Sequence, residues 1–172
     1  MVPEVVIVMG VTGVGKTTLG AALAAERGVP FLEGDAFHPP ENVRKMSAGI
    51  PLQDADRWPW LELLGQAIAA RREPDGAVAT CSALKRVYRD RLRSLIAEPL
   101  LFVCLQADRE AIAARMQARR GHYMPVALLD SQLATFELPG KDERAIVLAA
   151  GESVHNLLAR LRTEFQIGSN HA

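Results

Sequence analysis

Apolar and polar residues alternate along the chain in blocks that predict strands and helices in turn. The run Val5–Met9 is entirely apolar and mostly β-branched, which is typical of a parallel strand buried on both faces. The segment Leu19–Arg27 is rich in alanine and leucine and predicts a helix. Similar patterns predict further strands at 31–33, 77–81, 100–105 and 145–148, and further helices at 41–47, 59–72, 86–97, 109–119, 126–137 and 153–165.

The regular alternation of strands and helices predicts an α/β fold. Strands joined by helices pair in parallel, so we expect a five-stranded parallel sheet with helices on both faces. The 172 residues suit one domain, and no linker, repeat or low-complexity segment divides them. Gly121–Pro125 interrupts two helices and resembles a hinge, which predicts a helical lid at about 115–130.

Composition excludes several classes of protein. Twenty basic and twenty acidic residues cancel, so no overall field favours binding to nucleic acid or membrane. No apolar run approaches the ~20 residues of a membrane span, and the first strand begins too early to leave room for a signal peptide. Cys81 and Cys104 lie within apolar runs without metal-ligand spacing, which favours buried free thiols. We therefore expect a cytoplasmic protein.

The strongest motif follows the first strand. The sequence from Gly10 to Lys16 and Thr17 reads Gly-x-x-x-x-Gly-Lys-Thr, and it lies between a predicted strand and a predicted helix. In such a loop, backbone N–H groups at the helix N-terminus bind phosphate, the lysine reaches the β- and γ-phosphates, and the threonine holds Mg²⁺. An ordinary glycine-rich turn is the alternative. The predicted ATP-binding residues of this loop are Gly10, Gly13, Val14, Gly15, Lys16, Thr17 and Thr18.

Polar residues also follow the second predicted strand. In a parallel α/β sheet, ligands bind beyond the carboxyl ends of the strands, so Glu33, Asp35 and His38 are candidates for a second substrate site. Asp35 is the predicted base, because phosphoryl transfer to a hydroxyl needs a carboxylate that orients it and accepts its proton. Glu33 is a candidate Mg²⁺ ligand, and His38 a candidate donor to a polar substrate. The alternatives are that Asp35 caps the following turn, that Glu33 is simply solvated and that His38 has a structural role.

Two basic groups are further candidates. Lys85, with Arg86 and Arg89, follows the third predicted strand and could neutralise a phosphate or bind an anionic substrate. The arginines that precede the predicted hinge could enter the site when the lid closes. For both groups, a solvated helix surface is the alternative. The arginines near the hinge are Arg115, Arg119 and Arg120. Arg57, with Asp54 and Asp56, either helps to cap the next helix or forms part of the acceptor site.

Absent motifs narrow the possibilities. The sequence lacks the Asp-x-x-Gly and Asn/Thr-Lys-x-Asp motifs of a GTPase switch protein. The run Val78–Cys81 is followed by Ser82 instead of the aspartate that is usual in motor and remodelling ATPases. A small-molecule kinase is the favoured function. A nucleotide-binding regulatory protein without turnover is the alternative from another class.

Taken together, these motifs resemble the gluconate kinase (gluconokinase) family. The resemblance lies in Met9–Thr17, in Phe31–Pro39 and in several later blocks, and it runs in register from about residue 5 to residue 150. The later blocks are Asn42 with Lys45, Met46 and Gly49; Pro51–Leu52 with Asp54, Asp56–Arg57 and Pro59–Leu61; Cys81–Lys85 with Tyr88–Asp90; Arg119–Tyr123; and Ser131–Gln132 with Glu137 and Pro139.

The resemblance implies a P-loop kinase fold related to shikimate and nucleoside monophosphate kinases, usually as a homodimer. It also implies MgATP-dependent phosphorylation of D-gluconate to 6-phosphogluconate, with a shikimate-kinase-like or other small-molecule kinase as the alternative. One of Lys85, Arg89 and Arg57 would bind the substrate carboxylate. The expected catalytic residues are Lys16, Asp35, Lys85 and Arg120; the substrate contacts are Asp35, His38, Arg57, Lys85, Arg89 and His122; the ATP contacts include Arg115 and Arg119; and the Mg²⁺ ligands are Thr17 and Glu33.

Overall fold

One parallel sheet forms the centre of the computed structural model, which describes residues 4–72, 74–97, 99–119 and 125–169. Its five strands in these ranges lie in the order β2-β3-β1-β4-β5, and all four strand pairs are parallel. The predicted five-stranded parallel sheet is confirmed. The strands are β1 (Glu4–Met9), β2 (Phe31–Leu32), β3 (Gly76–Thr80), β4 (Leu100–Gln106) and β5 (Ala145–Ala149).

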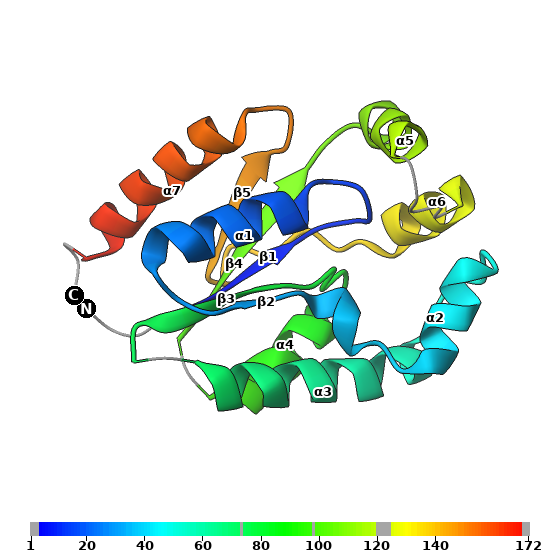
Figure 1. Ribbon diagram of the computed structural model, residues 1–172, viewed down its shortest axis with the longest axis horizontal. Helices are drawn as coiled ribbons and strands as arrows, with labels where there is room; N and C mark the ends of the chain where they lie inside the picture. Colours follow the sequence, from blue (N-terminus) through cyan, green and yellow to red (C-terminus); the bar gives the residue numbers. More distant parts are fainter. Residues whose placement is uncertain (1–3, 73, 98, 120–124, 170–172) are drawn as a thin grey trace.

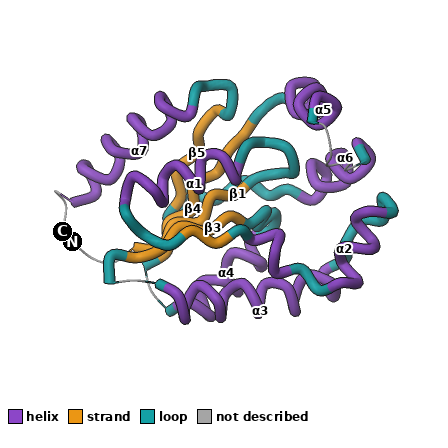
Figure 2. The backbone as a smooth tube through the Cα atoms, viewed as in Figure 1, coloured by secondary structure: helices purple, strands orange, loops and turns teal. Residues whose placement is uncertain are grey.

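Helices cover both faces of this sheet. Figure 1 shows α1 and α7 on one face and α3 and α4 on the other. In the tube view, α2, α5 and α6 lie together at the opposite end of the molecule from the chain termini (Figure 2). The helices are α1 (Lys16–Arg27), α2 (Pro40–Ser47), α3 (Asp54–Arg71), α4 (Arg86–Ile96), α5 (Arg109–Ala118), α6 (Val126–Thr135) and α7 (Val154–Ser169), with a 3₁₀ turn, η1 (Gly34–Phe37).

The core is built on the central strands. β1 lies between β3 and β4, and each residue from Val5 to Met9 is at most 1% exposed. A strand flanked on both edges and covered on both faces needs an uninterrupted apolar run, which is the pattern found in the sequence. Cys81 and Cys104 are buried free thiols, as predicted, and burial raises their pKa values to about 12 and about 11. No helix within the described residues is long and apolar enough to cross a membrane.

The start of α3 corrects one prediction. The sequence favours a polar turn at 53–57 and a helix from Pro59, but the helix begins at Asp54 and includes Pro59. A capping box explains the earlier start: Asp56 accepts a hydrogen bond from the backbone N–H of Gln53 at 2.8 Å, and the Gln53 side chain accepts one from the Asp56 backbone. The extra turn places Arg57 on a helix that packs under the sheet.

Candidate active site

The phosphate-binding loop begins where β1 ends. Gly15 is the N-cap of α1 at φ 107°, a left-handed conformation that favours glycine. No side chain caps this helix, and its first turn contains no acidic residue. Its N-terminal N–H groups therefore have no competing side-chain acceptor at the cap, which is the arrangement that binds phosphate. The loop is fixed to the sheet by the Gly10 N–H, which donates to the Ser82 carbonyl at 3.3 Å.

Lys16 and Thr17 emerge from this loop toward the acidic residue that follows β2. The Lys16 ammonium donates to the Val11 carbonyl at 3.0 Å. Burial lowers the pKa of Lys16, and the carboxylates of Asp35 and Glu33 act in the opposite direction. The Thr17 hydroxyl donates to Glu33 Oε2 at 2.5 Å. The loop thus directs a cation and a hydroxyl toward the segment that follows β2, and these are the groups that a phosphate-binding loop uses for MgATP.

The arrangement around Glu33 suits Mg²⁺. Its second carboxylate oxygen accepts from the Thr80 hydroxyl at 2.5 Å, so Glu33 is held between Thr17 and the end of β3. Within the described ranges, no cluster of three or more histidine, cysteine or acidic side chains could hold a metal by itself. Mg²⁺ commonly binds through few protein oxygens together with waters and substrate phosphates. The Thr17 hydroxyl and the nearby Glu33 carboxylate are therefore a fitting donor set.

Asp35 lies on the η1 turn, which packs directly on the end of β3. The Gly34 N–H donates to the Thr80 hydroxyl at 3.0 Å, and the Gly34 carbonyl accepts from Trp60 Nε1 at 2.8 Å. A Cβ at residue 34 would lie 1.9 Å from the Thr80 carbonyl oxygen, so only glycine allows this close approach. The turn leaves the Asp35 side chain 67% exposed, at the rim of the pocket.

One pocket brings the phosphate loop and the acceptor candidates together. Lys16, Asp35, His38 and Arg57 all line it, although they come from three separate segments of the chain: the start of α1, the η1 turn and α3. The floor and walls are completed by apolar residues and by side chains of α6, and the full lining is Thr12, Lys16, Asp35, His38, Met46, Pro51, Leu52, Arg57, Trp60, Ser82, Leu128, Ser131 and Gln132.

His38 is held firmly within this pocket. Its ring stacks on Trp60, with the ring centroids 4.1 Å apart and the planes inclined by 17°. His38 Nε2 lies 3.8 Å from Asp35 Oδ1, and Nδ1 lies 3.2 Å from Asn42 Nδ2. Burial and the Arg57 cation lower the pKa of His38 to about 4, against the raising effect of Asp35. The ring is therefore neutral at physiological pH.

Arg57 is a second cation that lines the pocket. It is 7% exposed, and one guanidinium nitrogen donates to the Tyr88 hydroxyl at 3.0 Å. Tyr88 in turn donates to Asp54, which also accepts from Lys85 at 3.1 Å. Asp54 raises the pKa of Lys85, and the hydrogen bonds from Tyr88 and Lys85 lower the pKa of Asp54. Lys85 is thus paired with Asp54 and does not line the pocket.

Comparisons with known proteins identify the family of this chain. A family model described as an AAA domain matches residues 5–139. A gluconokinase from Gluconobacter oxydans is 48% identical over 165 residues, which cover 95% of this chain and 92% of the relative. The chain belongs to the gluconokinase family. A crystal structure of a gluconokinase from Sinorhizobium meliloti has a TM-score of 0.83 and 44% identity, covering 97% of this chain and 98% of that one.

The fold of this gluconokinase-family chain extends to more distant kinases. A shikimate kinase structure from Bacteroides thetaiotaomicron has a TM-score of 0.67 at 15% identity, covering 95% of this chain and 98% of that one. Identity this low reports the fold alone. It bears out the P-loop kinase fold related to shikimate kinases that the family resemblance implies.

Arg89 corrects a prediction about the acceptor site. Its side chain is 0% exposed and forms a bidentate ion pair with Glu143, at 2.8 and 2.9 Å. The remaining guanidinium nitrogen donates to the carbonyls of Ala83 at 2.9 Å and Glu137 at 3.1 Å. With all three nitrogens engaged, Arg89 cannot contact a substrate in the pocket. It is a structural residue that holds the loop after β3 against the segment that precedes β5.

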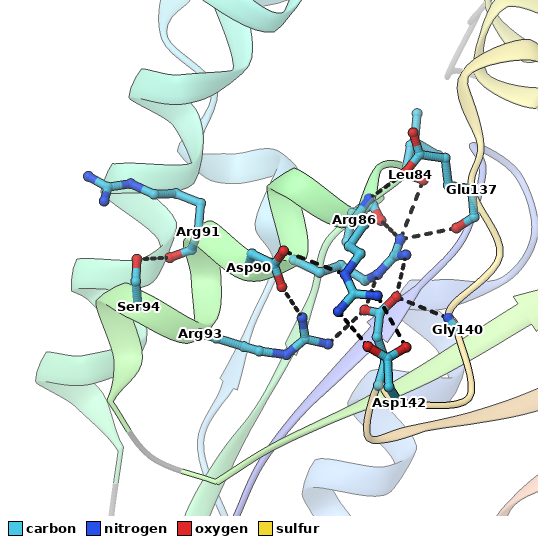
Figure 3. Close-up of polar contacts among 12 residues, drawn as sticks. Leu84, Arg86, Asp90, Arg91, Arg93, Ser94, Glu137, Gly140 and Asp142 are labelled. Carbon is cyan, nitrogen blue, oxygen red and sulfur yellow. Dashed lines mark hydrogen bonds and ion pairs between the residues drawn. The ribbon is translucent and has the colours of Figure 1, made fainter.

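A wider polar network surrounds this ion pair. Figure 3 shows Arg93, Gly140 and Asp142 on the same group of contacts, between α4 and the chain that leads to β5. Glu143 also accepts from Arg93 at 2.7 Å and from the Gly140 N–H at 3.1 Å. The Glu137 carboxylate accepts from the Arg86 N–H at 2.8 Å, at the first residue of α4. The network therefore fixes the segment that connects α6 to the sheet.

The predicted lid is described only in part. Arg115 donates to the Val14 carbonyl at 3.3 Å and to the Ala150 carbonyl at 3.0 Å, so it joins the phosphate loop to the turn after β5. Arg119 is exposed at the end of α5, and its charge contributes to the lowered pKa of Lys16. Thr18 is exposed on α1. The expected roles of Arg120 and His122 fall at 120–124, outside the described residues.

Several residues of the site were not predicted from the sequence, and three of them hold the others in place. Gln132 accepts a hydrogen bond from the Thr12 N–H at 2.7 Å and lines the pocket from α6. Thr80 connects Glu33 to Gly34, and Trp60 supports the His38 ring. A polar residue inside an apolar strand was a usable signal for Thr80. Gln132 and Trp60 offered no comparable local signal, because their partners are distant in sequence.

Proposed function

We propose that the protein transfers the γ-phosphoryl group of ATP to the terminal hydroxyl of D-gluconate and produces 6-phospho-D-gluconate. The observation that carries this proposal is the shared pocket, in which the phosphate-loop lysine, Lys16, meets Asp35, His38 and Arg57. A kinase for a polyol acid needs a phosphate grip, a carboxylate for the hydroxyl and a cation for the acid group. Membership of the gluconokinase family supports the choice of gluconate.

Asp35 is the proposed base. It follows the second strand beside the phosphate loop, and its exposed carboxylate lines the same pocket as Lys16. In the proposed step, the substrate hydroxyl oxygen forms a bond to the γ-phosphorus while the bond to the bridging oxygen of ADP breaks. The hydroxyl proton passes to Asp35 and then to solvent. Asp35 orients the hydroxyl and removes its proton as the phosphoryl group transfers.

Arg57 is the proposed partner of the gluconate carboxylate. It remains the candidate because Arg89 is enclosed by Glu143 and backbone carbonyls, whereas Lys85 is paired with Asp54 outside the pocket lining. A planar guanidinium can bind a carboxylate through two parallel hydrogen bonds, which fixes both the position and the direction of the sugar chain. Tyr88 holds Arg57 in place from behind.

Lys16, Thr17 and Glu33 form the proposed MgATP side. Lys16 would neutralise the charge on the transferring group, Thr17 would hold Mg²⁺, and Glu33 would orient its waters. When bound, the ion supplies charge neutralisation at the β- and γ-phosphates. Arg115 and Arg119 are the proposed additional cations near the phosphate loop. Closure of a lid at about 115–130 would exclude water from the transfer.

An ADP-release assay tests the substrate. The purified protein is given MgATP and, separately, D-gluconate, related sugar acids, shikimate and nucleoside monophosphates. We expect turnover with gluconate at a kcat/KM at least about 100-fold above that with the other acceptors, because hydroxyl pairing discriminates strongly. Chelation of Mg²⁺ should abolish it. Preference for shikimate or a nucleotide would overturn the acceptor assignment, and ATP binding without turnover on any acceptor would favour a regulatory protein.

The assembly and location complete the proposal. We propose a single catalytic domain that forms a homodimer in the cytoplasm, in keeping with the family resemblance. Sedimentation equilibrium across a concentration series would give a dimer mass. A monomer mass at every concentration at which the enzyme is active would contradict the dimer.

A further inference from the structure

Asn42, on α2, contacts two polar groups behind the acceptor pocket. We propose that Asn42 is a positioning residue that fixes His38 as the neutral tautomer with its proton on Nε2, so that the pocket offers a hydrogen-bond donor beside Asp35. The inference rests on the proposed function in one respect: the donor would serve a hydroxyl oxygen of a polyol acid. The tautomer itself is a property of the free protein.

The orientation of the Asn42 amide is set by the backbone. Asn42 is 3% exposed, and its Nδ2 lies 2.9 Å from the Asp56 carbonyl oxygen. A carbonyl only accepts hydrogen bonds, so the amide NH₂ group must face it. The same nitrogen lies 3.2 Å from His38 Nδ1 and has a second hydrogen to donate. His38 Nδ1 must then carry a lone pair, which leaves the ring proton on Nε2.

The surroundings prevent a flip of the His38 ring, which would interchange the positions of Nδ1 and Nε2. His38 is stacked on Trp60, and Trp60 is itself fixed by its hydrogen bond to the Gly34 carbonyl. The His38 side chain is 4% exposed, so a rotated ring would need space that the packing does not provide. The Asn42 amide and the Trp60 ring therefore determine which nitrogen faces the pocket.

The pocket-facing end of this ring complements a hydroxyl group. His38 Nε2 and Asp35 Oδ1 are 3.8 Å apart, which is too long for a direct hydrogen bond, so the Nε2–H donor is not used by Asp35. A hydroxyl both donates and accepts. One hydroxyl bound at this point can donate its proton to Asp35 and accept from His38. Asn42 thus helps the pocket to distinguish a hydroxyl from a group that can only donate.

Asn42→Asp is the direct test, because it keeps the shape of the side chain and replaces the donor with an acceptor. The new carboxylate would accept from Nδ1, and the ring would lose its fixed Nε2–H tautomer or become protonated. We expect kcat/KM for gluconate to fall about 10- to 100-fold, the usual effect of losing a charged or buried hydrogen bond, with KM for ATP unchanged. Asn156→Asp makes the same change at an exposed position and should keep full activity.

Nitrogen-15 NMR of the unliganded protein decides the tautomer without relying on any activity. The spectrum of His38→Gln identifies the His38 signal among the four histidines of the sequence. The wild-type signal should show protonated Nε2 and unprotonated Nδ1, and Asn42→Asp should remove this pattern. A purely structural Asn42 would leave the pattern intact while lowering stability. The proposal would be overturned by a protonated Nδ1 in the wild type, or by a wild-type value of kcat/KM in Asn42→Asp. Absence of gluconate turnover in the wild type would refute only the proposed function.

Discussion

The buried ion pair between Arg89 and Glu143 allows a quantitative test of what stabilises the fold. Glu143→Gln removes one charge and leaves the Arg89 guanidinium, which is 0% exposed, without its bidentate partner. Breaking a buried pair in this way costs about 3–5 kcal/mol, because an uncompensated charge remains in the interior. For a domain of this size, that is a large part of the free energy of unfolding.

The pKa of Glu143 reflects the same interaction. The hydrogen bond from Arg89 is the first cause that lowers this pKa, from 4.5 to about 2. One pKa unit corresponds to about 1.4 kcal/mol, so the charged carboxylate stabilises the folded protein by roughly 3 kcal/mol at neutral pH. Because the folded-state pKa is the lower one, this stabilisation is complete above about pH 4.5 and is lost as the pH falls toward 2.

Urea unfolding at pH 7 measures the effect, with fluorescence of Trp58 and Trp60 and far-UV circular dichroism as independent probes. Asp142→Asn is the matched control, because it removes the neighbouring ion pair between Asp142 and Arg86. The Asp142 side chain is 64% exposed, so this change should cost less than about 1 kcal/mol. Between pH 5 and pH 2, Glu143→Gln should lose about 3 kcal/mol less stability than the wild type. Equal losses for the two variants at pH 7 would refute the argument.

Four further substitutions test the site and the turn that supports it. Asp35→Asn should lower kcat by two to four decades, with the Kd for ATP nearly unchanged in a nucleotide-binding titration, because it removes a positioned base; near wild-type turnover would contradict this role. Lys16→Ala should weaken both ATP binding and transfer, and an effect on kcat alone would show that Lys16 does not hold the ground-state phosphates. Arg57→Lys should raise KM for gluconate by about 10- to 100-fold while KM for ATP stays constant, since lysine cannot bind a carboxylate in the bidentate way. Gly34→Ala should destabilise the protein by more than about 3 kcal/mol in thermal or urea unfolding, because its Cβ would lie 1.9 Å from a backbone oxygen, whereas Gly151→Ala meets no atom within 4 Å and should be neutral.

The strands and the phosphate loop were predictable because their signals are local. A buried parallel strand needs a continuous apolar run, and the phosphate loop needs its glycines, lysine and threonine at fixed spacing. The confirmed strand boundaries differ from the predicted ones by at most one residue at either end. The start of α3 was missed because Pro59 suggested a first turn, whereas the capping box depended on Gln53 and Asp56, a weaker variant of the usual motif.

The roles of the cations could not be predicted, because tertiary packing decides them. Arg57 and Arg89 look equivalent in the sequence, as basic residues near the start of helices. Arg89 is enclosed because Glu143, 54 residues further along, packs against it, whereas Arg57 lines the pocket. Gln132 meets Thr12 across 120 residues. Where two such segments meet depends on the sheet order and on helix packing, which the spacing of one segment does not encode.

The hydrogen bond between the Thr12 N–H and Gln132 joins the phosphate-binding loop to α6. Gln132 belongs to α6, which lines the acceptor pocket, and Thr12 belongs to the loop that holds phosphate. A nucleotide that moves the Thr12 peptide would strain or break this hydrogen bond, and so would an acceptor that moves α6. Linkage then requires reciprocity: whatever factor ATP applies to the affinity for the acceptor, the acceptor applies to the affinity for ATP.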